Sequence, residues 1–138
     1  MGHFELGFRA PRALENALQA ISQRVGRTIT LNELLQSWGE FVAAVERGYS
    51  YSIYDYANDL AVRDLIEEVT EAVLPEDAEA IRRVIDGDDN RFRDLTTPLN
   101  RPIVALETIS ERRWWYYRVP RKAGDELTKD LQSEGIGD

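Results

Sequence analysis

Four carboxylates near the middle of the chain are spaced so that they share one face of a helix. Asp64, Glu67, Glu68 and Glu71 fall at positions i, i+3, i+4 and i+7, which are neighbours on a helix surface. Like charges at this spacing repel one another, and a basic partner would relieve the repulsion and be drawn in by the negative field. The stripe therefore predicts a docking face for a basic protein. A solvated face that only aids solubility is the alternative interpretation.

The stripe lies in the most acidic part of the chain. Residues 54–89 contain twelve acidic and three basic residues and carry a formal charge of −9, whereas all 138 residues together carry −8. Four of the six tyrosines lie between residues 49 and 56, where they offer large, fairly rigid contact area or seal a junction between two helices. The predicted docking residues are Tyr54, Asp59, Asp64, Glu67, Glu68 and Glu71.

A second motif, with the sequence RRWWYYR, places aromatic rings between arginines at residues 112–118. As a strand it would alternate, so that Trp114, Tyr116 and Arg118 face the same way. Aromatic platforms beside positive charge hold single-stranded nucleic acids. These three residues are therefore the predicted contacts of an alternative module that binds single-stranded nucleic acid or another planar ligand. A strand packed on both sides and a protein interface are the other two interpretations.

The chain lacks most of the residues that catalysis and metal binding need. The chain has no cysteine and a single histidine, His3, which excludes the usual nucleophile–base pairs and the nitrogen- and sulfur-rich metal sites. Residues 86–90 begin like a calcium loop, but Arg91 stands where the loop needs glycine. Asp55 and Asp59, one turn apart, are the best carboxylate pair for hydrolysis. Because such pairs are common on solvated helices, we expect a non-enzymatic protein without metal or cofactor.

Composition places the chain among soluble globular proteins. Hydrophobic residues make up 43% and charged residues 30% of the sequence, which is ordinary for that class. The N-terminus has no signal-peptide pattern and no apolar run reaches the ~20 residues of a membrane span. The absence of cysteine fits a reducing compartment. We therefore expect a cytoplasmic protein without membrane contact.

The net charge also limits the class of partner that we expect. A sequence pI near 4.7 argues against general binding to duplex nucleic acid, because most of the surface would repel phosphates. Length, acidity and the lack of catalytic groups are compatible with small bacterial immunity or antitoxin proteins, which shield basic toxins, although no motif is shared with them. The expected partner is a basic protein, and the sequence is also compatible with a homo-oligomer.

Four helices are predicted to position these residues. The first begins at Pro11 and ends at Gly26, and the second runs from a capping box at Thr30 to Gly48. The third begins near Ser52 and continues to about Val73, with a break near residues 58–59 as the alternative. The fourth follows Pro75 and ends at Gly87.

The rest of the chain is predicted to differ in kind. Residues 86–90 read as a turn, and residues 103–109 and 113–119 as strands of a hairpin, with residues 4–8 as a third, edge strand. A last short helix from Asp125 would bury Leu127 and Leu131. The predicted fold is α+β and mostly helical, with a small antiparallel sheet near the C-terminus, in one domain over residues 1–138 with a frayed tail from about residue 133.

Overall fold

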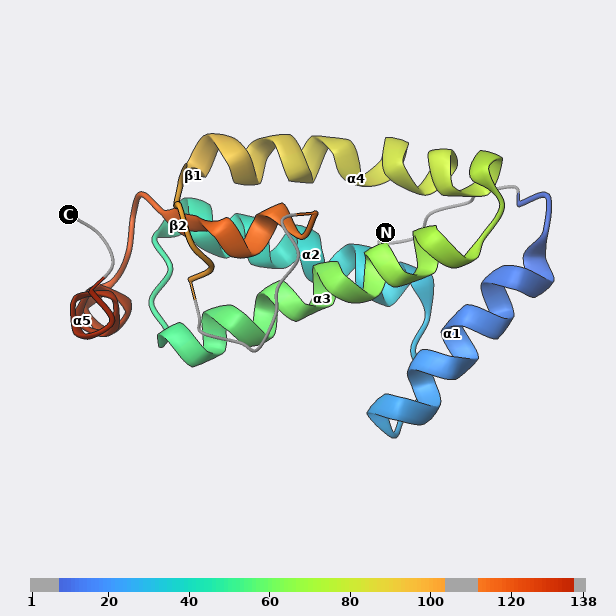
Figure 1. Cartoon of the computed structure of the whole chain (residues 1–138), viewed down its shortest axis with the longest axis horizontal. Coiled ribbons are helices and arrows are strands. Elements are labelled where there is room, and N and C mark those ends of the chain that lie inside the picture. The colour runs from blue at the N-terminus through green and yellow to red at the C-terminus, as the bar shows by residue number, and fades with distance from the viewer. Residues whose placement is uncertain (1–7, 104–111, 136–138) are drawn as a thin grey trace.

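The computed structural model describes residues 8–103 and 112–135. In chain order it contains α1 (Pro11–Val25), α2 (Leu31–Arg47), α3 (Ile53–Ala72), α4 (Pro75–Leu95), β1 (Thr96–Pro98), the 3₁₀ helix η1 (Trp114–Tyr117), β2 (Arg118–Pro120) and α5 (Asp125–Ser133). The predicted fold class is confirmed: the described chain is mostly helical, with a two-stranded antiparallel sheet near its C-terminus (Figure 1).

The helix starts follow from capping chemistry that is legible in the sequence. The Thr30 hydroxyl accepts a hydrogen bond from the Glu33 N–H, and Ser52 and Asp55 form a reciprocal capping box at the start of α3. Proline occupies the first turn of α1 and α4, where its missing N–H costs nothing. These predicted starts are confirmed, and α3 runs without the alternative break at residues 58–59.

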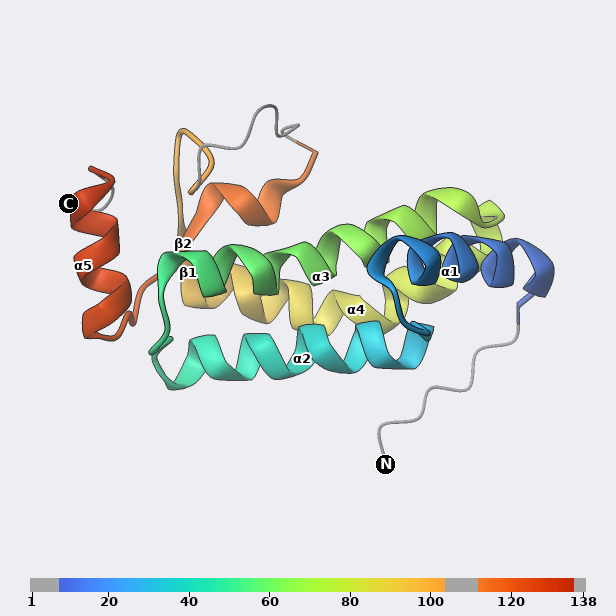
Figure 2. The same cartoon turned by 90° about the horizontal axis from the view of Figure 1, so that it is seen from below.

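Helices α2, α3 and α4 pack against one another, and α1 lies along the C-terminal half of α3 (Figure 2). The centre is a cluster of large aromatic side chains. The Trp38 ring lies 5.2 Å from the Phe92 ring, and the Phe41 ring lies 5.5 Å from the Tyr56 ring, measured between centroids. All four side chains are buried, so burial of apolar area is the main force that holds the three helices together.

No helix in the described ranges is long and apolar enough to cross a bilayer.

Helix α4 corrects the prediction that the chain turns at residues 86–90. The helix passes through Gly87 and continues to Leu95, although glycine and aspartate are poor helix formers. The side chains of Asp89 and Phe92 are both buried on its inner face. Tertiary packing of this face therefore overrides the local preference for a turn.

The aromatic motif corrects a second prediction. Trp114–Tyr117 form the 3₁₀ helix η1, and Arg118–Pro120 form a strand that pairs with Thr96–Pro98. The reason is that Trp115 and Tyr116 both donate to Asp64, whereas neighbouring residues of a strand point to opposite faces. Residues 104–109 and 4–7, the remainder of the predicted strands, lie outside the described residues.

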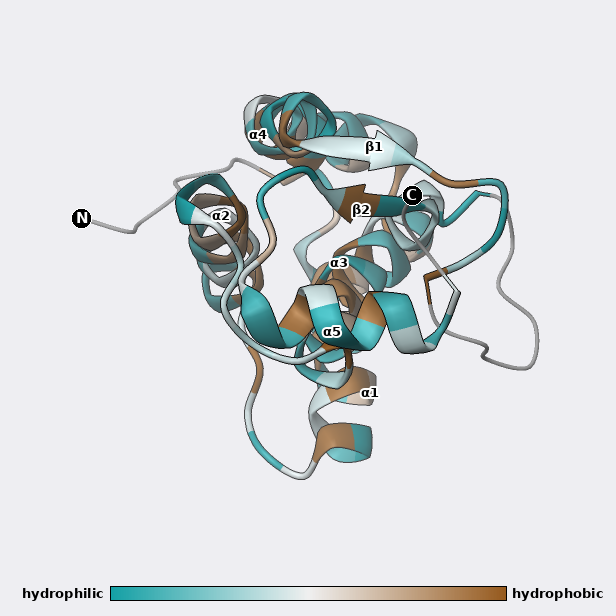
Figure 3. Cartoon of the chain, turned by 90° about the vertical axis from the view of Figure 1, so that its left-hand side faces the viewer, coloured by the Kyte–Doolittle hydropathy of each residue, from teal (hydrophilic) through white to brown (hydrophobic). Residues whose placement is uncertain are grey.

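Helix α5 begins at Asp125 and buries Leu127 and Leu131, as predicted. It packs at the start of α3, where the Asp130 carboxylate accepts a hydrogen bond of 3.0 Å from the Ile53 N–H. Figure 3, seen from this end of the molecule, shows β1 and β2 side by side and α5 in front of α3. Of the predicted frayed tail, residues 136–138 lie outside the described part.

Candidate functional site

The predicted acidic stripe does lie on one helix, α3, but most of its carboxylates are bonded within the protein. Asp64 accepts hydrogen bonds from the Trp115 indole N–H at 2.8 Å and from the Tyr116 hydroxyl at 2.6 Å. The Arg113 guanidinium lies 3.5 Å from the same carboxylate. Asp64 therefore holds η1 in place against α3.

Glu67 and Glu68 are bonded to arginines of three helices. Glu67 lies 3.1 Å from Arg63, on its own helix, and 4.0 Å from Arg82 of α4. Glu68 accepts two hydrogen bonds, of 2.7 and 3.0 Å, from the guanidinium of Arg24 at the end of α1. Such bidentate pairs are the strongest geometry for an arginine and a carboxylate. The repulsion expected along the stripe is thus offset within the fold.

Glu71 is the exposed member of the stripe. Together with Glu67, Arg112 and Arg113 it lines a small cleft of about 170 Å³ between α3 and the residues that precede η1. Two acidic and two basic side chains line this cleft, so their charges largely offset one another. The C-terminal half of α3 therefore offers a basic partner much less negative charge than the sequence suggests.

The N-terminal half of α3 is different. Tyr54 is 71% exposed, more than any other large hydrophobic side chain in the described ranges, and Tyr51 is 58% exposed. The carboxylates of Asp55 and Asp59 lie one turn apart on the same helix. Neither carboxylate is in an ion pair with any residue that the structure describes. This surface, formed by Tyr51, Tyr54, Asp55 and Asp59, is called the tyrosine–aspartate surface below.

Buried contacts fix the tyrosine–aspartate surface from beneath. The hydroxyl of the buried Tyr49 donates a 2.6 Å hydrogen bond to Asp59 Oδ2. The Tyr51 ring packs edge-on against the Tyr49 ring, 5.7 Å away. Asp55 Oδ2 accepts from the Ser52 N–H and hydroxyl as part of the helix cap. The positions of both carboxylates are therefore set by the start of α3 and by the connection that precedes it.

The environment of Asp59 disfavours the ionised form of its carboxyl group. Partial burial raises the pKa of this carboxyl above its ordinary value of 3.8, the negative charge of Asp55 raises it further, and the Tyr49 hydrogen bond opposes both. Burial of Tyr49 and its hydrogen bond to the Asp59 carboxylate raise the pKa of the Tyr49 hydroxyl. A positive group placed beside Asp59 would stabilise the ionised carboxylate.

The alternative ligand-binding residues do not form a common platform. Tyr116 is only 4% exposed and its hydroxyl is bonded to Asp64. The Trp114 ring is half-buried and is covered by the Arg93 guanidinium, 3.9 Å from the ring centroid. Arg118 donates to the Thr96 hydroxyl and to the carbonyls of Arg93 and Thr96. The structure thus places these three residues in packing and hydrogen-bonding roles against α3, α4 and β1.

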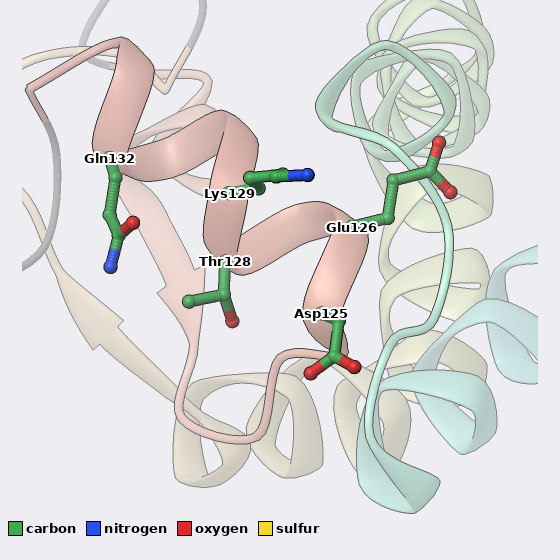
Figure 4. A pocket seen from close by; sticks show the side chains of 5 residues that line it. All are labelled: Asp125, Glu126, Thr128, Lys129 and Gln132. Carbon is green, nitrogen blue, oxygen red and sulfur yellow. The ribbon is translucent and has the colours of Figure 1, made fainter.

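A wider cleft of about 350 Å³ runs along α5 and is lined by Asp125, Glu126, Thr128, Lys129 and Gln132. Figure 4 shows these five side chains pointing in different directions rather than toward one centre. General acid–base or nucleophilic catalysis needs groups within hydrogen-bond reach of a common atom. This arrangement has no such convergence.

In residues 8–103 and 112–135, no three histidine, cysteine, aspartate or glutamate side chains gather closely enough to hold a metal ion. Among the described residues, the tyrosine–aspartate surface is the feature best suited to a ligand, because it combines exposed rings with carboxylates that form no ion pair there. Comparisons with protein-family models, with curated proteins and with solved structures found no match for this chain.

The sequence prediction named Tyr54 and Asp59 as docking residues. It also singled out the tyrosine cluster at residues 49–56 and the Asp55/Asp59 pair, but it did not add Tyr51 and Asp55 to the docking residues. The Ser52–Asp55 cap was legible, and it fixes where α3 starts. That start places Tyr54 and Asp55 on the outer side of the helix. The hydrogen bond from Tyr49 to Asp59 crosses a helix boundary, and nothing in the local spacing signals it.

Proposed function

We propose that this chain is a non-enzymatic protein-interaction domain that binds a basic protein partner through the tyrosine–aspartate surface. The observation that carries the proposal is the exposure of Tyr54 on the same helix turns as two carboxylates that form no ion pair with any described residue. Large aromatic side chains are the residues that most often dominate binding energy at protein interfaces. Carboxylates of one sign around them steer a basic protein toward the surface.

The remaining predicted docking residues have a secondary part in this proposal. Asp64, Glu67 and Glu68 are bonded to groups of the same chain, so a partner would have to displace those groups to reach them. Glu71 is exposed and adds to the negative field. We therefore place the contact at the N-terminal half of α3. The C-terminal half of this helix packs against α1 and η1 and has a structural role.

Two finer points belong to the same proposal. The formal charge of −8 suits an immunity- or antitoxin-like role, in which the basic partner is a toxin that the domain shields. A cytoplasmic location is proposed because a chain without cysteine needs no oxidising compartment. Nucleic-acid binding through Trp114, Tyr116 and Arg118 is not favoured, since the rings are covered and the arginine is bonded to β1.

The test is a comparison of three tagged proteins used to capture partners from the native host. These are the wild type, an Asp55→Asn/Asp59→Asn variant, and a control Asp86→Asn/Asp94→Asn variant, which loses the same charge from exposed positions of α4. The expected result is a basic protein retained by the wild type and the control and lost by the α3 variant, with a yield that falls as salt rises. Equal retention by all three proteins would contradict the proposal.

A further inference from the structure

The structure shows how this chain binds its own arginines. The Arg63 guanidinium lies between the carboxylates of Asp89 and Glu67, and the Trp115 ring centroid is 4.5 Å from its central carbon. The site thus combines carboxylates, at 2.9 and 3.1 Å, with one aromatic face. Both contacts suit a flat guanidinium, which stacks on rings and donates from a planar fork.

The tyrosine–aspartate surface has the same components without an arginine. Asp55 and Asp59 provide two carboxylates four residues apart on α3, about 6 Å along the axis. The hydrogen bonds that described residues donate to these carboxylates go to Oδ2, from Ser52 to Asp55 and from Tyr49 to Asp59. Among the described residues no donor reaches the two Oδ1 atoms, so each carboxylate retains an acceptor for an incoming group.

The aromatic part of this surface comes from two exposed rings. Tyr51 is held near Asp59 through its edge-on contact with Tyr49, whose hydroxyl bonds that carboxylate. Tyr54 lies on the first turn of α3, next to Asp55 in the sequence and about 100° from it around the helix axis. Both rings are more than half exposed, so their faces are accessible to a partner.

We infer that the tyrosine–aspartate surface recognises an arginine side chain of the partner protein and prefers it to lysine. The inference rests on the function proposed above and specifies its chemistry. A guanidinium has five donors in one plane and can bridge two carboxylates while it stacks on tyrosine. A lysine ammonium is compact and strongly hydrated, so it interacts with one carboxylate at a time and gains less from the rings.

The electrostatics of Asp59 support this assignment. Burial and the charge of Asp55 hold the pKa of Asp59 above its ordinary value, which means that its negative charge is poorly compensated in the free protein. A guanidinium between the two carboxylates would reverse this shift. The pKa of Asp59 is therefore expected to fall when an arginine peptide binds.

The experiment uses the full-length protein and two peptide probes of equal length and charge, one of alternating arginine and serine and one of alternating lysine and serine. Affinities are measured by isothermal titration calorimetry at low and at physiological ionic strength. The arginine peptide is expected to bind about tenfold more tightly, the scale of one stacked guanidinium with improved carboxylate geometry. The Asp59 carboxyl, followed by NMR, is expected to titrate at lower pH in the arginine complex.

Variants separate the rings from the charges. Replacing both rings (Tyr51→Leu/Tyr54→Leu) should remove the preference for arginine, while Tyr51→Phe/Tyr54→Phe, which keeps two ring faces, should retain most of it. The Asp55→Asn/Asp59→Asn variant should weaken both peptides, and the Asp86→Asn/Asp94→Asn control should weaken neither to the same extent. Circular dichroism establishes that each variant is folded.

The possible failures are distinguishable. If both peptides bind with equal affinity and both depend on Asp55 and Asp59, the arginine inference is overturned and the proposed function stands. If the leucine variant keeps the full preference for arginine, the rings are not the cause and the inference is overturned as well. If Asp55→Asn/Asp59→Asn leaves both affinities unchanged, the inference and the proposed function fall together.

Discussion

Arg63 of α3 and Asp89 of α4 form an ion pair inside the protein. The Arg63 Nε and Nη2 atoms donate to Asp89 at 3.1 and 2.9 Å, and the two residues are only 4% and 5% exposed. The Trp38 indole N–H of α2 donates to the same carboxylate at 2.9 Å. One carboxylate thus bonds residues of two other helices. Its burial is tolerable because every buried side-chain polar atom in the described ranges has a partner.

Removing one member of this pair should be far more costly than replacing both. Asp89→Ala would leave the Arg63 charge buried without its main partner, and we expect a loss of about 3–5 kcal/mol in the free energy of unfolding. The double variant Arg63→Met/Asp89→Leu should recover part of that loss, because an apolar pair of similar size needs no desolvation, whereas the Trp38 indole N–H still lacks its acceptor. Urea denaturation at neutral pH measures both effects.

The control for this experiment is Asp86→Ala, an exposed position on the same helix. It should change the unfolding free energy by less than about 0.5 kcal/mol. If Asp89→Ala costs no more than this control, the buried pair does not stabilise the packing of α4.

The same pair shows which parts of the fold could be predicted from sequence. Helix starts at Thr30, Ser52 and Pro75 depend on local capping chemistry, so their residues predict them directly. The continuation of α4 beyond Gly87 depends on Arg63, a residue far away in the chain, so local propensity predicts a turn instead. A usable signal was present, because Arg63 lies three residues from Leu60 and from Ile66, in line with the buried face of α3.

The features of the candidate site likewise include some that the sequence predicts and some that it does not. Helical spacing correctly predicted that Asp64 to Glu71 share one helix. It could not reveal that Arg24 of α1 pairs with Glu68, or that two side chains of η1 donate hydrogen bonds to Asp64. The prediction of a strand at residues 113–117 was wrong. Two consecutive side chains, Trp115 and Tyr116, donate hydrogen bonds to the same carboxylate, that of Asp64, whereas consecutive side chains of a strand point in opposite directions. Local periodicity gives the face of an element, whereas the partners on that face are set by the tertiary fold.

Asp64 should be required for the conformation of η1. In Asp64→Ala the Trp115 indole N–H and the Tyr116 hydroxyl lose their acceptor, and each unsatisfied buried donor costs about 1–3 kcal/mol. We expect reduced stability together with a weaker near-ultraviolet circular dichroism signal, since the Trp115 environment becomes less ordered. A variant with wild-type stability and an unchanged aromatic signal would show that η1 is held by packing alone.

Charge reversal should distinguish two acids of the predicted stripe. Glu67 lies between Arg63 and Arg82, so Glu67→Lys places a third cation beside two others and should destabilise the protein measurably. Glu71 is exposed and is in no ion pair with a described residue, so Glu71→Lys should change stability by less than about 0.5 kcal/mol. Thermal unfolding of the two variants at low and high salt gives the comparison. Equal losses would mean that the ion pairs of Glu67 contribute nothing.

The last prediction concerns Asp59 and the dependence of stability on pH. Burial, aided by the charge of Asp55, raises the pKa of Asp59 in the folded protein above its ordinary value of 3.8. The folded state therefore binds this proton more tightly than the unfolded state does. Linkage then requires that the contribution of Asp59 to stability decreases as pH rises from 3.8 to the raised folded value, and stays unfavourable above it.

Asp59→Asn removes this unfavourable term and keeps an oxygen that accepts the Tyr49 hydrogen bond. Relative to the wild type, the variant should gain stability as pH rises through the window between 3.8 and the raised folded pKa, and keep that relative gain at neutral pH. Below the window both proteins carry an uncharged side chain at this position, so the relative gain should vanish. Urea denaturation of both proteins at several pH values from 3 to 7 provides the measurement. A difference that does not change with pH would show that Asp59 ionises equally well in the folded and unfolded chains, and its charge would then offer no special gain to an incoming arginine.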